Sequence, residues 1–442
     1  MKKIQNMGSE TENIMDRISI VLASDYQYLV FAYITIFSVL KNRKRPYYVE
    51  FYIMLPEKTR VLNYNQNWEF DRYEINYIEI PEYCFSGHAL SIEHTAKPTY
   101  YRLMIPDILQ NVNKCLYLDA DILVCNDLWE LYNFDISQID LMAGLGVDIH
   151  YSEDHIRKLA DYLQIDSAEK YFNAGVLVMN LEKMRAENMV ETFLECSKKG
   201  WTCQDQDVLN ICCYGRTEIF PMKYNVYSIA YGCEEEILKA RFSVKEIEEG
   251  LNNPVIIHYA MGNTKPWYNL RTIRAEDWWK AAKEAIPGQE YRKMREIAEK
   301  KTLQSNISDF VPKIELYEKI VIFGCGKTGK KLLEFINKKY AGKVEAFWDN
   351  NHEHIGAMYQ NIPVRQPEEK TNENVLIVIS CQQEVEEIKL QLYELGYEDN
   401  DIAVYNSQSF VSWFGTDRQY RKQIIEKIQK HISGDEGKQK MQ

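Results

Sequence analysis

The sequence has no segment suited to crossing a membrane and little that would attract a polyanion. Its longest apolar-rich run, residues 29–40, is too short to span a bilayer and fits a buried helix. The first residues lack the apolar core of a signal peptide. A net charge of -12, with no concentrated basic face, argues against a nucleic-acid partner. We therefore expect a cytoplasmic protein, soluble or peripheral at the inner face of the membrane.

Cysteine pairs of the kind that bind zinc are also lacking. The ten cysteines are scattered, without a C-x-x-C pair or a Cys/His cluster at zinc spacing, which is typical of reduced cytosolic thiols. There is no repeat and no low-complexity tract. What the chain does have is 442 residues of globular composition, which predicts two compact units.

Apolar, β-rich runs alternate with helical patterns along the first 260 residues. This alternation is typical of an α/β fold with a largely parallel sheet, in which ligands bind beyond the carboxyl ends of the strands. A helix is expected from about Tyr28. The expected strands are 18–24, 47–55, 77–80, 114–118, 141–145, 175–179 and 254–258.

The pattern starts afresh after a charged helical stretch, residues 272–305. From Lys319 a strand, a glycine turn, a helix and two strands predict a smaller α/β domain that ends near Val411. The tail from Asp417 has seven Lys or Arg against four Asp or Glu. It could touch an anionic membrane surface or form a solvated terminal helix. The sequence is also compatible with a homo-oligomer.

The strongest signal for chemistry is the stretch KCLYLDADILV, an apolar strand that ends in Asp119 and Asp121. Residues i and i+2 of an extended segment point the same way, so both carboxylates would face one site. An acidic turn in solvent is the simpler alternative. Because apolar residues flank the pair on both sides, we expect it to be buried with a counter-charge, and hard oxygen ligands suit Mn²⁺ or Mg²⁺.

Two further turns follow predicted strands. His258 ends a short apolar strand in VIIHYAMGNTKPW and could be a third metal ligand, while Lys265, beyond Gly262, could contact a diphosphate. At the first turn, Asp25 could accept the N–H of a uracil. Alternatively, Ser24 or Asp25 is a plain helix N-cap.

These pieces together resemble glycosyltransferase family 8, a retaining family that includes glycogenin and bacterial lipopolysaccharide glucosyl- and galactosyltransferases. Six segments match in the family's order between about Arg17 and Ile286. They are LASDYQYL, TYYRLMIPDIL, YLDADILV, YFNAGVLVMNL, QDQDVLN and HYAMGNTKPW. One departure lies in the first turn, which commonly reads Asp-Asn-Tyr and here reads Tyr26-Gln27-Tyr28.

The resemblance implies a glycosyltransferase-A fold and transfer of glucose or galactose from a UDP-sugar to a glycan, lipid-linked or cell-envelope acceptor. It implies Mn²⁺ (or Mg²⁺) held by Asp119, Asp121 and His258. It further implies UDP contacts from Ala23, Ser24, Asp25, Tyr28, Ala120, Gly262 and Lys265. By the same resemblance Arg102 approaches the donor, and the transferred sugar is surrounded by Asp148, Asn173, Asp205 and Gln206.

Gln206 occupies the family's candidate nucleophile position. An amide is a poor nucleophile, so we favour attack by the acceptor hydroxyl on the face from which UDP leaves. Gln206 would then stabilise the oxocarbenium-like state, and Asp205 would bind sugar hydroxyls. A helix N-terminus with acidic first-turn residues is the structural alternative for this segment.

The second predicted domain carries a dinucleotide-type fingerprint. Gly324, Gly326 and Gly329 have G-x-G-x-x-G spacing, and Asp349 ends the next strand twenty residues later. This favours a small Rossmann-like domain. Its role would be structural or nucleotide-sensing, with NAD-dependent redox or epimerase chemistry as the alternative function. The predicted domains are thus 17–286, a linker 287–318, 319–411 and a basic tail 412–442.

Overall fold

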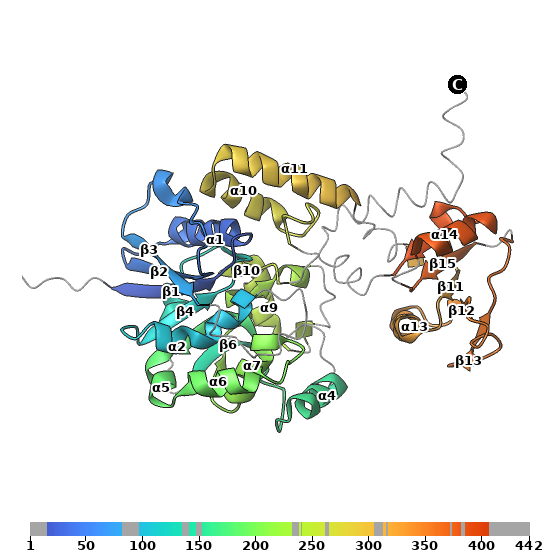
Figure 1. Ribbon diagram of the computed structural model, residues 1–442, viewed down its shortest axis with the longest axis horizontal. Helices are drawn as coiled ribbons and strands as arrows, with labels where there is room; N and C mark the ends of the chain where they lie inside the picture. Colours follow the sequence, from blue (N-terminus) through green and yellow to red (C-terminus); the bar gives the residue numbers. More distant parts are fainter. Residues whose placement is uncertain are drawn as a thin grey trace, which may run out of the picture. The chain divides into compact units, whose positions relative to one another are not determined.

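The computed structural model describes most of the chain and groups it into two compact units. Described are residues 16–81, 97–134, 141–146, 153–231, 238–239, 241–260, 265–304, 313–314, 317–371, 374–381 and 385–405. The first unit contains residues 1–227, 234–260 and 280–291, and the second contains 228–233, 261–279 and 292–442. Figure 1 shows the sheet of the first unit in blue to green and that of the second in orange to red. The predicted tail 412–442 lies outside the described residues.

The first unit is built on a seven-stranded sheet. Its spatial order is β3 (Tyr73–Ile80), β2 (Tyr48–Pro56), β1 (Arg17–Ala23), β4 (Lys114–Leu118), β7 (Phe172–Asn180), β6 (Met142–Gly146) and β8 (Thr217–Ile219). Only β7 is antiparallel to its neighbours β4 and β6, so the other strands all run one way. The carboxyl ends of β1 and β4, which are paired, therefore meet at one edge of the sheet.

A second, three-stranded sheet lies in the same unit and was not predicted as a sheet. It consists of β5 (Ile122–Val124), β10 (Ile256–His258) and β9 (Val226–Tyr227). Strands β10 and β5 are antiparallel, with His258 opposite Ile122. This register places the predicted histidine ligand next to the residue that follows Asp121.

Helix α1 (Leu29–Asn42) is apolar on nearly all sides, and residues 31–40 are all buried, as expected of a helix inside a core. Its Thr35 hydroxyl lies 3.1 Å from the carbonyl oxygen of Ala120 and 2.9 Å from that of Ile122. The helix therefore anchors the turn that carries the acidic pair.

In the main core of the first unit, strands β1, β4 and β7 pack against several helical segments. These segments are η3 (Lys97–Met104), α2 (Ile105–Ile108), α5 (Leu181–Ala186), α6 (Met189–Ser197) and α7 (Gln204–Cys212). Further helices are α3 (Trp129–Tyr132), α4 (Glu153–Leu163) and α9 (Val244–Asn252). The predicted helical stretch 272–305 is two helices, α10 (Ala275–Ala285) and α11 (Gly288–Gln304), because Pro287 interrupts it.

The second unit contains a six-stranded sheet in the order β13 (Met358–Tyr359), β14 (Ile362–Arg365), β12 (Val344–Trp348), β11 (Lys319–Phe323), β15 (Val375–Ile379) and β16 (Ile402–Val404). All pairs are parallel except β13 with β14. Helix α13 (Lys327–Lys339) packs on one face of the sheet. Helix α14 (Val385–Glu394) packs on the opposite face and forms a separate core there.

The predicted strands agree with the observed ones to within a few residues, and 114–118 is reproduced as β4. Short strands without a long apolar run, such as β8, β9 and β16, were not predicted. Nowhere in the described residues is a helix both long and apolar enough to cross a membrane.

Candidate active site

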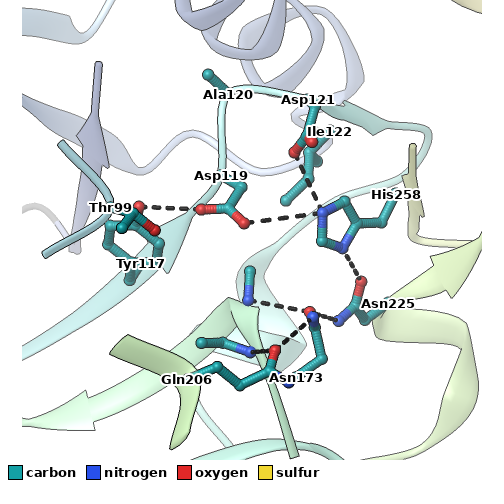
Figure 2. A network of polar contacts seen from close by, with 12 residues as sticks. Thr99, Tyr117, Asp119, Ala120, Asp121, Ile122, Asn173, Gln206, Asn225 and His258 are labelled. Atoms are coloured by element: carbon teal, nitrogen blue, oxygen red, sulfur yellow. Dashed lines mark hydrogen bonds and ion pairs between the residues drawn. The ribbon is translucent and has the colours of Figure 1, made fainter. Parts of the chain in front are cut away.

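The two predicted carboxylates and the predicted histidine converge at the edge where β1 and β4 end. Nε2 of His258 lies 3.1 Å from Oδ1 of Asp121 and 3.8 Å from Oδ2 of Asp119. Figure 2 shows the three side chains facing one another. Each side chain offers one ligand atom, and these three atoms lie within 4.8 Å of one another, close enough to share a metal ion. His258 is 2% exposed, and the pair of acids is more open.

Local structure explains why these three meet. Asp119 and Asp121 follow β4 directly, and the backbone N–H of Asp119 donates to the carbonyl of Gly175 on β7 at 2.8 Å. On the other side, the N–H of Tyr259 donates to the carbonyl of Asp121 at 3.0 Å. The β5 to β10 pairing thus holds His258 against the acidic turn.

Gly175 leaves the room that the three ligands need. A Cβ atom at this position would lie 2.3 Å from Cε1 of His258 and 2.7 Å from Oδ2 of Asp119. Glycine inside a strand weakens it and often marks a close approach of another group. Here the approaching groups are the side chains of His258 and Asp119, so the glycine leaves room for an ion site beside β7.

The donor set suits a hard divalent cation. Two carboxylate oxygens and one imidazole nitrogen are ligands that Mn²⁺ accepts, and such ions keep open positions for substrate phosphates. The residues present therefore fit the predicted Mn²⁺ or Mg²⁺.

A pocket of about 170 Å³ adjoins the cluster and contains most of the predicted donor contacts. Its lining residues are Ala23, Ser24, Asp25, Tyr28, Pro98, Thr99, Arg102, Tyr117, Asp119, Ala120 and Asp121. Oδ1 of Asp25 accepts from the N–H of Tyr28 at 2.8 Å, in the turn before α1, but the N-cap residue of α1 is Tyr28, so the alternative of a plain N-cap at Ser24 or Asp25 is wrong. The pocket and the acidic pair thus share the same strand ends.

Arg102 lines this pocket as part of a buried network. Its guanidinium pairs with Asp119 at 2.8 Å and with Asp205 at 2.9 Å, and it stacks over the Tyr117 ring at 4.3 Å. A further donor group of Arg102 bonds to the carbonyl of Ala174. Burial would lower the pKa of Arg102, but the two carboxylates outweigh it and raise the pKa. The arginine is thus fixed in place by β4, β7 and α7.

Asp205 is 4% exposed, and both its oxygens are engaged. Oδ1 accepts from the Thr99 hydroxyl at 2.7 Å, and Oδ2 pairs with Arg102. Burial raises the pKa of Asp205 to about 6, although Arg102 and Thr99 act against this rise. In this structure Asp205 positions Arg102, and its contact with sugar hydroxyls stays a prediction.

The side chain of Gln206, on α7, bonds to three neighbours on or next to β7. Its Oε1 accepts from Nδ2 of Asn173 at 3.0 Å and from the N–H of Ala174 at 3.1 Å, and its Nε2 donates to the Tyr171 hydroxyl at 2.9 Å. Tyr171 in turn donates to Asp207 at 2.6 Å. The amide is therefore fixed in orientation beside Asn173, as the predicted grouping of these two residues requires.

Three predicted contacts stay untested. Lys265 belongs to the second unit, where its ammonium lies 5.6 Å from the centre of the Trp267 ring, so its contact with a diphosphate stays a prediction. Asp148 and Gly262 lie outside the described residues. Sequence reasoning also missed Thr35, Asn225 and Gly175 as parts of the site. Of these, only Gly175, a glycine within a strand, carried a recognisable signal.

In the second unit, the glycine turn follows β11 as expected. A Cβ on Gly329 would lie 1.9 Å from the carbonyl oxygen of Gly324, whose φ is +103°, so both glycines serve close packing. Asp349 accepts from the N–H groups of Cys325 and Asn351, each at 2.9 Å, and pairs with His354 at 2.9 Å. The oxygens predicted to bind a ribose are thus used within the unit.

Comparison with known proteins assigns the family. The family model described as Glycosyl transferase family 8 matches residues 19–271, more than half of the chain. The chain belongs to this family. It is a glycosyltransferase with a glycosyltransferase-A-type fold of mixed α/β sheets. A second family model, described as C2185-like, N-terminal, matches residues 316–403, and the expected Rossmann-like dinucleotide domain is not shown.

Individual relatives are distant. A putative glycosyltransferase of Haemophilus influenzae is 26% identical over 259 residues, which cover 57% of this chain and 73% of that protein. The lipopolysaccharide 1,2-glucosyltransferase of Escherichia coli is 29% identical, and the match covers 41% of this chain and 52% of that protein. The solved galactosyltransferase LgtC, bound to donor and acceptor sugar analogues, is 25% identical with a TM-score of 0.52. That match covers 63% of this chain and 100% of LgtC.

Proposed function

We propose that this family 8 glycosyltransferase transfers glucose or galactose from a UDP-sugar to a glycan or cell-envelope polysaccharide, with Mn²⁺ or Mg²⁺ and with retention of anomeric configuration. The observation that carries the proposal is the convergence of Asp119, Asp121 and His258 beside a pocket at the strand ends. The names of the similar Escherichia coli glucosyltransferase and of the galactosyltransferase LgtC support a hexose donor and a saccharide acceptor.

Asp119, Asp121 and His258 would hold the ion. When bound, such an ion offsets the negative charge that the UDP leaving group gains as the glycosidic bond breaks. The turn Ala23 to Asp25 would take the uracil and ribose, because it ends β1 and lines the same pocket as the acids. Lys265 and Gly262 would complete the diphosphate contacts.

The fixed amide of Gln206 supports front-face attack. Its oxygen already accepts two hydrogen bonds, so it is suited to orienting the sugar and not to forming a covalent bond with it. The acceptor oxygen would bond to the anomeric carbon while the bond to the phosphate oxygen breaks. The proton of the acceptor hydroxyl would pass to the departing phosphate. Asn173, Asp148 and Asp205 would surround the sugar.

The catalytic domain would extend over residues 17–286, with a linker 287–318, a further domain 319–411 and a tail 412–442. A cytoplasmic location and membrane contact through the tail stay predictions. No observation in the described residues favours NAD-dependent redox or epimerase chemistry by the second unit.

A panel of UDP-sugars tests the proposal. With Mn²⁺ present, the protein should release UDP from UDP-glucose or UDP-galactose, and a saccharide acceptor should increase the rate. EDTA should stop the release, and added Mn²⁺ should restore it. Release that is absent from every donor, or that is unaffected by EDTA, would overturn the proposal.

A further inference from the structure

We infer that Asn225 is a positioning residue that fixes the ring tautomer of His258, so that Nε2 presents its lone pair to the ion; this inference rests on the proposed metal centre. Asn225 is completely buried, and its Oδ1 lies 2.9 Å from Nδ1 of His258. It immediately precedes β9, which pairs in parallel with β10, so the backbone carries Asn225 to the far side of the imidazole ring.

The orientation of the amides follows from two backbone N–H groups of β7, which can only donate. The N–H of Gly175 points to one side-chain atom of Asn173 at 3.0 Å, so that atom is the carbonyl oxygen. The same oxygen lies 3.0 Å from the terminal atom of Asn225, which must therefore be the NH₂ group. In the same way, the N–H of Ala174 fixes the oxygen of Gln206, which accepts the NH₂ group of Asn173.

These assignments place a hydrogen on Nδ1 of the histidine. With its NH₂ group directed at Asn173, Asn225 turns its carbonyl oxygen toward His258, and an oxygen must receive a proton from Nδ1. Figure 2 shows this continuous series from His258 through Asn225 and Asn173 to Gln206. In the neutral ring Nδ1 then carries the only hydrogen and Nε2 presents its lone pair, whereas a protonated ring would also direct a hydrogen from Nε2 at Asp121.

The consequence appears on the other side of the ring. The Nε2 lone pair of the neutral ring faces carboxylate oxygens of Asp121 at 3.1 Å and of Asp119 at 3.8 Å. Acceptors that face one another across such distances repel unless a positive charge lies between them. Asn225 thus stabilises the one neutral form of His258 that favours an ion over a hydrogen bond to Asp121. Partners of this kind typically change metal affinity by roughly 10- to 100-fold.

The first test needs no metal. The full-length protein is labelled with nitrogen-15 in its eight histidines, and solid-state NMR reports the tautomer of each ring. The spectrum of His258→Ala identifies the His258 signals. We expect a hydrogen on Nδ1 in the metal-free protein and a larger fraction of rings without it in Asn225→Leu, which keeps the branched shape but not the carbonyl. A ring in the unaltered protein with a hydrogen on Nε2 and none on Nδ1 would overturn the inference without any variant.

The second test measures Mn²⁺ binding from the loss of the free-ion EPR signal. Asn225→Leu should weaken binding by roughly 10- to 100-fold. The matched control is Asn210→Leu, since Asn210 is also a buried asparagine but bonds only to backbone atoms of Phe172 and Gln206. Equal losses in the two variants would overturn the role of Asn225. With saturating Mn²⁺, UDP release by Asn225→Leu should recover toward the rate of the unaltered protein.

Separate outcomes test the metal centre and the role of Asn225. If the unaltered protein binds no Mn²⁺, the proposed metal-dependent function is overturned, while the metal-free NMR spectrum still decides whether Asn225 fixes the ring. If Mn²⁺ binds but its affinity and the His258 tautomer are the same in Asn225→Leu, the metal centre stands and the inference about Asn225 falls.

Discussion

Both units contain an apolar parallel strand that ends in aspartate, yet the two acids have different surroundings. Asp349, after β12, receives backbone N–H groups on both oxygens and the His354 ring as well. Asp119, after β4, receives Arg102 and Tyr117 on one oxygen, while the other is turned toward His258. The acid proposed to bind an ion is thus the one with an oxygen turned toward another proposed ligand, whereas both oxygens of the other acid accept backbone N–H groups.

The glycines of the two units differ in the same sense. Gly175 leaves space next to two predicted ligands, whereas Gly329 leaves space next to the backbone of the Gly324 turn. Gly175 is required by the side chains proposed to bind the metal ion. Gly329 is required by the packing of α13 against the sheet of the second unit. Glycine spacing alone, as in G-x-G-x-x-G, does not distinguish these two requirements.

Replacing one acid in each unit by alanine should give the largest difference between the two units. Asp121→Ala should lower kcat/KM for Mn²⁺-dependent UDP release by roughly 100- to 1,000-fold, because the ion that offsets the charge of the leaving group loses a ligand. Asp349→Ala should stay within about twofold of the unaltered protein, since its oxygens serve the fold of the second unit. Initial rates at several Mn²⁺ concentrations measure both. Comparable losses in the two variants would contradict the assignment of metal binding to Asp121 and of a purely structural role to Asp349.

Matched alanines at the two glycines give a smaller but sharper difference. Gly175→Ala should weaken Mn²⁺ binding by roughly tenfold or more, because its Cβ would displace His258 or Asp119. Gly329→Ala should leave Mn²⁺ binding unchanged and destabilise the second unit by about 1–3 kcal/mol, since its Cβ meets backbone. EPR titration measures the first effect, and hydrogen exchange of peptides from β11 and α13 measures the second. Unchanged Mn²⁺ affinity in Gly175→Ala would contradict the placement of the site.

Local sequence accounts for much of the first unit but not for the way its parts meet. β4 and the acidic pair were predictable because an apolar run ends in two charges, and the histidine because it ends another such run. Their convergence depends on β5 and β10, strands of three residues whose pairing places His258 opposite Ile122. Such short strands carry no periodicity long enough to recognise, and their register is set by the tertiary structure.

The supporting residues were less predictable still. Asn225 stands next to a two-residue strand, and its partners lie 33 and 52 positions away in the sequence. The role of Asp205 also depends on context, because only the structure shows that Arg102 and Thr99 take both its oxygens. For Asp349 the fingerprint predicted the position at the strand end correctly, while a ribose contact is not supported by the donors around it.

The smallest expected effect is a pH dependence confined to the second unit. Burial alone would raise the pKa of Asp349, but the N–H groups of Asn351 and Cys325 and the His354 ring outweigh it and lower the pKa below its usual value near 3.8. A carboxyl whose pKa is lower in the folded state adds stability above its unfolded pKa, and this stability is lost as the pH falls through the folded pKa. Asp349→Asn should therefore reduce hydrogen-exchange protection of β11 at pH 7, after correction for intrinsic rates, and the difference should shrink near pH 3. A difference that persists undiminished in acid would show that the charge of Asp349 does not hold the glycine turn.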